Sequence, residues 1–202
     1  MIYNMITMDG GITPSGTISI SANGDYDVSA FASASVNVPT GGISFDDIAM
    51  RTVSGSATGS ATGIGNYAFS GCSVLTNASF PNATSIGNHA FSGCSALTNA
   101  SFPNATSIGS YAFNGCSALT NASFPNVISI GNYAFSGCRE LFSFYLLGSS
   151  IPTLANATAF YNTPISISSG GMYGSIFVPA SLYDSYVSAT NWSAYSARFV
   201  SV

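Results

Sequence analysis

The chain has 202 residues, of which only 5% are charged, and its formal net charge is −4 with no lysine in the sequence. Proteins that bind nucleic acid through its phosphates need clustered lysine and arginine side chains, so this composition excludes that class. The mean hydropathy is positive at +0.37, but no apolar run approaches the roughly 20 residues that a membrane-spanning helix requires, so we expect no membrane insertion.

Residues 1–42 form a separate segment in which apolar and polar residues alternate around an Asn23–Gly24 turn. This alternation predicts paired β-strands. The stretch G-T-I-S-I-S-A-N-G-D-Y-D-V resembles small β modules that recur in tail and fibre proteins of phages of Gram-positive bacteria. The resemblance implies that the segment attaches the chain to other virion proteins or joins copies of it. Because phage fibres are commonly trimeric, a homotrimer is the first expectation.

Residues 43–63 are expected to be a linker followed by a degenerate coil that caps a series of 22-residue repeats. Counting one repeat back from Ala78 and Phe80 places Ser56 and Thr58 at the inward positions of this coil. Its small polar residues suit a cap, because a terminal coil with an apolar outer face would associate with other chains. The glycines of this stretch are not followed by a lysine, so no phosphate-binding loop is expected.

Residues 64–150 hold four copies of one 22-residue motif, IGNYAFSGCSVLTNASFPNATS in its first form, starting at Ile64, Ile86, Ile108 and Ile130. A period of this length indicates a solenoid, in which each short unit buries its apolar side chains against its neighbours. In the segment LTNASFP the spacing predicts a strand with Leu97, Ala100 and Phe102 pointing inward. The other half, IGNHAFSGC, is too short for a full α-helix, so one turn of 3₁₀ or α structure is expected.

The recurring pattern I-G-x-x-A-F-x-x-C-x-x-L-x-x-A-x-F-P resembles the BspA-type leucine-rich repeat of bacterial and phage surface proteins. The similarity covers about residues 52–202 once the flanks are included. It implies an extended right-handed solenoid, β-rich with short 3₁₀ or α turns, that serves adhesion or recognition and has no catalytic activity.

Residues 151–202 are expected to form one irregular coil and a C-terminal cap. Ala159–Phe160 matches the earlier Ala-Phe pairs after an extended interval. A strand, a helix begun by Pro179 and Ser181, a second short helix near Trp192 and a last short strand should follow. The pattern V-P-x-x-L-x-x-x-Y-x-x-A-x-N-W resembles the usual C-terminal cap of the family.

Neither metal binding nor catalysis is suggested by the reactive side chains. The four cysteines occupy one position of successive repeats, namely Cys72, Cys94, Cys116 and Cys138. They should stack about 4.8 Å apart as buried free thiols, because their parallel Cβ directions make disulfide geometry poor. A zinc site would need C-x-x-C pairs or several histidines, and His89 is the only histidine. Residues 64–129 contain no carboxylate that could orient it for catalysis, and no cofactor is implied.

A repeating polar surface is the candidate ligand-binding site. It combines outward amides and hydroxyls of the strands with an aromatic column at one edge: Asn77, Ser79, Asn99, Ser101, Asn121, Ser123, Tyr67, His89, Tyr111 and Tyr133. Amides beside aromatic rings can bind sugar hydroxyls by hydrogen bonding and stacking. The alternative is that these side chains satisfy one another in ladders along the coil axis.

These features favour a non-enzymatic phage or prophage protein of the tail, fibre or decoration type. Such a protein would display its solenoid to recognise a host surface protein or glycan. Residues 1–11 lack the basic region and the long apolar stretch of a secretory signal, which a bacterial adhesin would normally need and a virion protein would not. The alternative is a bacterial cell-surface adhesin with the same solenoid, and a carbohydrate-active enzyme is a distant third.

Overall fold

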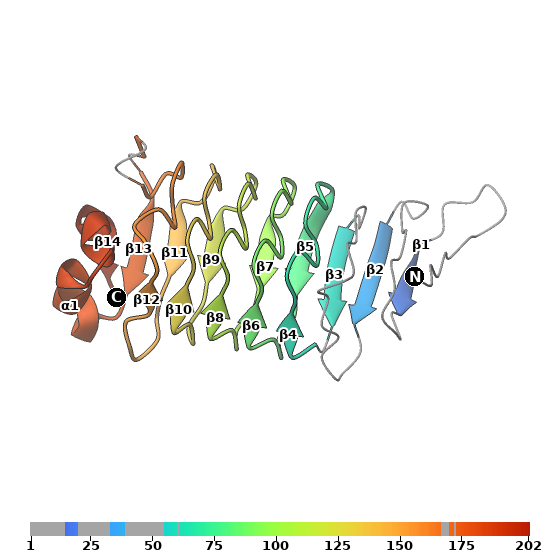
Figure 1. The fold of residues 1–202 in the computed structure, drawn as a ribbon, viewed down its shortest axis with the longest axis horizontal. Helices are drawn as coiled ribbons and strands as arrows, with labels where there is room; N and C mark the ends of the chain where they lie inside the picture. Colours follow the sequence, from blue (N-terminus) through green and yellow to red (C-terminus); the bar gives the residue numbers. More distant parts are fainter. Residues whose placement is uncertain (1–14, 20–32, 39–54, 60, 167–169, 172) are drawn as a thin grey trace.

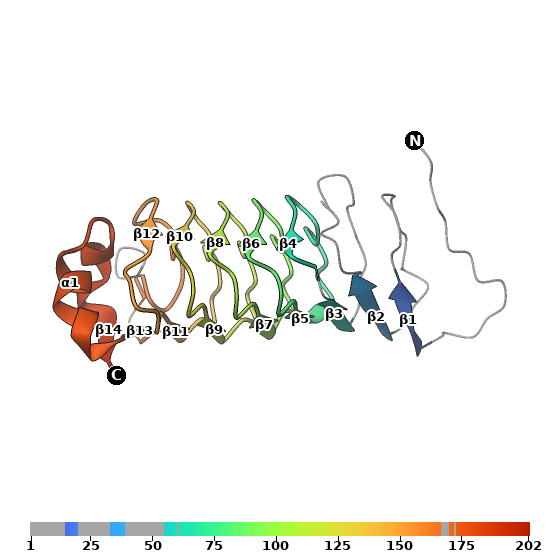
Figure 2. The same ribbon diagram turned by 90° about the horizontal axis from the view of Figure 1, so that it is seen from below.

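The repeats build a solenoid whose coils stack side by side along one long axis (Figure 1). The computed structural model describes residues 15–19, 33–38, 55–59, 61–166, 170–171 and 173–202. Each of the four repeats contributes one strand to a parallel sheet that we call sheet A, and a two-residue strand to a second parallel sheet, sheet B. The two sheets lie on different sides of the solenoid, as the view turned by 90° shows (Figure 2).

Strands follow one another along each sheet in chain order. Sheet A consists of β1 (Ser15–Ser19), β2 (Ser33–Val38), β3 (Gly55–Gly59), β5 (Leu75–Ser79), β7 (Asn99–Ser101), β9 (Asn121–Ser123), β11 (Ser143–Tyr145), β13 (Ser175–Val178) and β14 (Phe199–Ser201). Sheet B consists of β4 (Gly63–Ile64), β6 (Ser85–Ile86), β8 (Ser107–Ile108), β10 (Ser129–Ile130) and β12 (Thr153–Leu154). Each coil of the repeats therefore contacts mainly the coils before and after it, as in other solenoids.

The predicted strand orientation is confirmed. In the second repeat Leu97, Ala100 and Phe102 are buried, whereas Asn99 is exposed and Ser101 is half-buried. The alternation arises because successive side chains of a strand point to opposite faces, and only one face of sheet A meets the core.

The core consists of identical side chains stacked on one another. The fully buried ring of Phe91 stacks on Phe69 at 5.0 Å and on Phe113 at 5.2 Å between ring centroids. The interplanar angles are 4° and 6°, so the rings are almost parallel. The repeat period thus becomes a continuous ladder of rings inside the solenoid.

The half-repeat between the strands is a chain of short turns. Ser92 N donates to His89 O, and Cys94 N donates to Phe91 O, both at 3.1 Å and with the spacing of a 3₁₀ turn. A regular helix does not form, because His89 has a φ of 56° and Gly93 a φ of 78°. The expected short turns are confirmed, but the strands of sheet B were not predicted, since a two-residue strand carries no alternation.

The degenerate coil before the repeats has its own register. In β3, Ala57 lies opposite Ala78 of β5 and is fully buried, whereas Ser56 and Thr58 are half-buried. The inward positions predicted for this coil are therefore wrong by one residue. The apolar alanine takes the buried position, because the step from Thr58 to Gly63 is one residue shorter than the equivalent step from Ser79 to Ser85.

Sheet A continues into the N-terminal segment. β1 pairs with β2 and β2 pairs with β3, and both pairings are parallel. The predicted strands on either side of Asn23–Gly24 are present as β1 and β2, but their pairing is parallel, so they are not the two arms of a hairpin, and they form part of the same sheet as the repeats. The Asn23–Gly24 turn lies outside the described residues.

The C-terminal cap has the predicted sequence of elements, with η3 (Ala180–Leu182), α1 (Tyr183–Ser188) and η4 (Trp192–Arg198) between β13 and β14. The predicted equivalence of Ala159 with the alanines of the earlier Ala-Phe pairs is also confirmed. Phe135 N donates to Ala159 O at 2.8 Å, just as Phe113 N donates to Ala134 O one coil earlier. Trp192 is buried and donates through Nε1 to Pro152 O at 2.7 Å, so the cap closes the end of the core.

Among the described residues, no helix combines the length and the apolar character needed to cross a membrane.

Candidate ligand-binding surface on sheet A

The buried cysteines are free thiols, as predicted. Cys94, Cys116 and Cys138 each donate to a backbone carbonyl oxygen 25 residues earlier, over 3.0 to 3.2 Å. A hydrogen bond with Cys72 and burial raise the pKa of Cys94, and burial raises the pKa of Cys116. A raised pKa disfavours the reactive thiolate, so these side chains pack as small apolar groups. In the part of the chain that the structure describes, no group of three histidine, cysteine or acidic side chains could hold a metal ion.

The aromatic column is a continuous stack of rings. Centroid distances between successive members are 4.8, 4.7 and 5.0 Å, with interplanar angles of 3°, 4° and 14°, for the rings of Tyr67, His89, Tyr111 and Tyr133. All four residues have φ between 54° and 59°, a conformation that costs a non-glycine residue roughly 1–2 kcal/mol. Because neighbouring rings cover each other's faces, the inner members of the column offer a ligand only their edges and polar atoms.

The amides of sheet A form a ladder that ends after the second repeat. Asn99 Nδ2 donates to Asn77 Oδ1 at 2.5 Å, and Asn77 Nδ2 donates to Ser56 Oγ at 3.3 Å. Asn121 instead donates to the neighbouring Thr120 Oγ1 at 3.0 Å. The ladder is thus interrupted between the second and third repeats, where both asparagines remain exposed.

The asparagines that follow the prolines behave differently. Asn104 Nδ2 donates to Pro81 O at 2.8 Å, and Asn126 Nδ2 donates to Pro103 O at 2.9 Å. These amides satisfy backbone acceptors of the preceding coil, so this row is a structural ladder.

Sheet A opens where the amide ladder ends. β7 pairs with β9 only through Ser101 and Ser123, whereas β7 pairs with β5 through three residues. Among the described residues, the bond from Phe102 N to Ser123 O is missing, although its counterpart from Phe80 N to Ser101 O is formed at 3.0 Å. Ala100, beneath this opening, is 9% exposed, against 0% for the alanine of the preceding coil.

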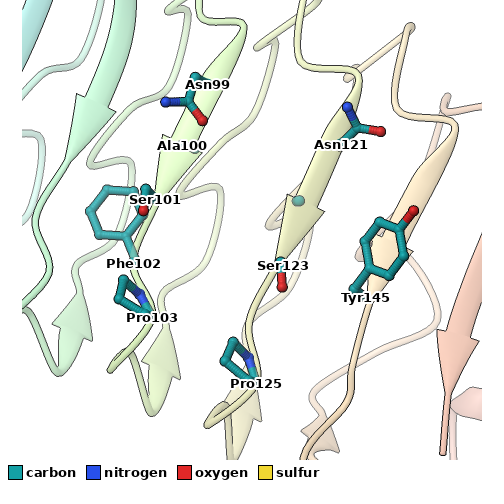
Figure 3. Close-up of a pocket in the computed structure, with 10 residues that line it drawn as sticks. Asn99, Ala100, Ser101, Phe102, Pro103, Asn121, Ser123, Pro125 and Tyr145 are labelled. Atoms are coloured by element: carbon teal, nitrogen blue, oxygen red, sulfur yellow. The ribbon is translucent and has the colours of Figure 1, made fainter.

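A groove of about 320 Å³ lies over this opening on the outer face of sheet A (Figure 3). Its lining comes from β7, β9, β11 and the segments after β7 and β9: Asn99, Ala100, Ser101, Phe102, Pro103, Asn121, Ala122, Ser123, Pro125 and Tyr145. The structure therefore brings together the predicted polar residues of the second and third repeats. Asn77, Ser79 and the whole aromatic column lie outside the groove.

Tyr145 is the lining residue that the sequence reasoning missed as a site residue. Its register partners are Ser123 on β9 and Phe177 on β13. The rings of Tyr145 and Phe177 stack at 4.5 Å with an interplanar angle of 11°. One face of the tyrosine is therefore covered, and the other borders the groove. The sequence does contain a feature that could have indicated Tyr145: the fourth repeat carries tyrosine where the first three carry serine.

The groove is uncharged. Its lining combines amides, hydroxyls and one phenol with alanines, prolines and a phenylalanine, and contains no acidic or basic side chain. The hydroxyls of Ser101 and Ser123 form no hydrogen bond with another described residue, so both remain available to a ligand. An uncharged site of this composition can exchange hydrogen bonds with hydroxyl groups but cannot neutralise an ion.

Parallel strands and short turns in 22-residue coils define a leucine-rich-repeat solenoid. The family model of the BspA type leucine rich repeat region matches residues 45–169 in six copies, and the chain belongs to this family. The match extends beyond residues 64–150 on both sides and confirms the predicted fold class. No curated protein and no solved structure matches the chain.

Proposed function

We propose that this chain is a non-enzymatic recognition protein that binds a neutral glycan of a cell surface in the groove on sheet A. The observation that carries the proposal is the convergence of exposed amides, free hydroxyls and one aromatic face at a single opening of the sheet. Concave sites with a few convergent polar groups are where proteins most often bind small ligands.

A neutral glycan fits this groove better than other ligand classes. Sugar hydroxyls both donate and accept hydrogen bonds, and the amides of Asn99 and Asn121 do the same. An anionic ligand would find no cation in the lining, and a protein partner would meet few of the large aromatic or arginine anchors that dominate protein interfaces.

The remaining predicted site residues extend the surface around the groove. Asn77 and Ser79 continue its polar rows toward the first repeat. The inner rings of the aromatic column, His89 and Tyr111, serve mainly to fix the turns, because both faces of each are occupied by stacking. Tyr67, at the end of the column, stacks on one side only and remains exposed to a ligand.

Two cellular settings fit this role. Display on a bacterial cell surface is supported by the family to which the solenoid belongs. Display on a phage or prophage virion, the first expectation from the sequence, is supported by the resemblance of residues 1–42 to phage β modules. In that setting the N-terminal segment attaches to other virion proteins. Antibodies against the chain, applied in electron microscopy, should label either the bacterial envelope or phage particles and so decide between the settings.

Affinity electrophoresis tests the binding proposal. The full chain is run in native gels that contain neutral polysaccharides (β-glucan, mannan or galactan) or acidic ones (polygalacturonate or hyaluronan). We expect retardation by a neutral polysaccharide that persists at high salt, because no ion pair is involved. Retardation by acidic polysaccharides alone, abolished by salt, would contradict the proposal.

A double variant locates the binding site in the same assay. Asn99→Ala combined with Asn121→Ala should remove retardation. Asn104→Ala is the matched control, because this amide is also exposed and donates to Pro81 O, and neither Asn104 nor Pro81 lines the groove.

A further inference from the structure

Outward side chains form a column across sheet A at one register position. Ser101 lies opposite Ser123, and Ser123 lies opposite Tyr145. Tyr145 in turn lies opposite Phe177, and these two rings stack at 4.5 Å. This distance is close to the strand spacing of about 4.8 Å, so one ring follows another along the sheet. The column therefore changes from hydroxyls to rings between β9 and β11.

The stack of rings ends inside the groove. Phe177 covers one face of Tyr145, and the opposite face borders the space over Ser123. The side chain of Ser123 is much smaller than an aromatic ring. The space beside Tyr145 that a further stacked ring would fill is therefore empty and forms part of the groove. Contact with Phe177 also holds the tyrosine ring in place, because an offset-stacked pair is favourable by about 0.5–1.5 kcal/mol.

We propose that a pyranose ring of the bound glycan fills this place and stacks on the free face of Tyr145, above Ser123. This inference rests on the proposed function and names the part of the groove that selects the sugar. A pyranose has apolar C–H groups on its faces and hydroxyls around its rim. Its face therefore suits the tyrosine ring, while its rim suits the amides of Asn99 and Asn121.

The same geometry determines which sugars bind. A pyranose whose hydroxyls are all equatorial has two flat C–H faces, whereas an axial hydroxyl obstructs one of them. A sugar of the glucose configuration can therefore stack through either face, whereas one of the galactose configuration can stack only through the face opposite its axial hydroxyl and so has one binding orientation instead of two. The groove spans β7 to β11, so an oligosaccharide has room to continue from Tyr145 toward Ser101.

Isothermal titration calorimetry on the full chain tests the inference. The probes are β-linked hexasaccharides of glucose, N-acetylglucosamine and galactose. Tyr145→Ser restores the serine of the other repeats and should weaken binding about tenfold by removing the stacking face. Tyr145→Phe keeps the ring and should retain binding. Ser123→Tyr should abolish binding by filling the place with a protein ring.

Val200→Tyr is the matched control, because it adds the same ring at the same register position of sheet A, on the far side of Phe177 and outside the groove. Unchanged thermal unfolding midpoints establish that each variant is folded. If the wild-type chain binds none of the probes, the proposed function and the inference both fail. If it binds a probe and neither Tyr145→Ser nor Ser123→Tyr weakens binding, the place over Ser123 is not occupied and the inference alone is overturned. Equal loss in Val200→Tyr would also overturn it.

Discussion

Replacing Phe113 by alanine tests whether the ring ladder holds the solenoid together. The Phe113 side chain is almost completely enclosed, and its ring stacks at 5.2 Å on Phe91 on one side and at 5.2 Å on Phe135 on the other. Phe113 N donates to Ala134 O at 2.7 Å, and similar bonds hold the neighbouring coils at fixed spacing. The coils therefore cannot approach each other to fill the cavity. We expect the variant to lose about 4 kcal/mol of folding free energy, within the range of about 3–5 kcal/mol for buried aromatic truncations.

Urea-induced unfolding, followed by circular dichroism, measures this loss. Phe91→Ala should cost about the same, because its ring has the same kind of neighbours one coil earlier. Tyr111→Ala is the control in the same coil as Phe113. Its ring is stacked but half-exposed, so we expect less than half the effect. Unfolding midpoints of Phe113→Ala close to wild type, or an equal loss in Tyr111→Ala, would show that the stack of phenylalanines is not the main source of stability.

Four further outcomes are expected. Gly109→Ala should destabilise in the same urea assay, because its Cβ would lie 2.6 Å from Asn88 N of the preceding coil. A thiol reagent should label none of the cysteines in the native chain and all four in urea, whereas a loss of hydrogens in mass spectrometry would indicate disulfides instead. Folding raises the pKa of Cys94 and Cys116, so the unfolded chain releases these protons first. Stability should then fall as the pH rises above about 8.5, and equal thermal midpoints at neutral and strongly alkaline pH would contradict this. Light scattering should show a trimer for the full chain and a monomer for a chain starting at Ile43. Monomers in both cases would refute a role of residues 1–42 in assembly.

Much of the fold follows from the sequence because contacts in a solenoid repeat with the same period as the residues that make them. The recurrence of Leu97, Ala100 and Phe102 every 22 residues predicted the strand, its buried face and the stacking of coils. The column of Tyr67, His89 and its counterparts was predicted in the same way. Where the period is imperfect, the reasoning failed. In the degenerate coil, counting selected Ser56, but Ala57 is buried instead, because the step from Thr58 to Gly63 is one residue shorter than the equivalent step in the first repeat.

The groove was decided only by the tertiary structure. The triplet Asn-Ala-Ser is identical in β5, β7 and β9, yet the sheet is closed between β5 and β7 and open between β7 and β9. Local sequence therefore cannot explain the difference. The width of the opening depends on how whole coils are spaced, and the free face of Tyr145 depends on its contact with Phe177, 32 residues further along the chain. Such a site arises between coils, so no single repeat encodes it.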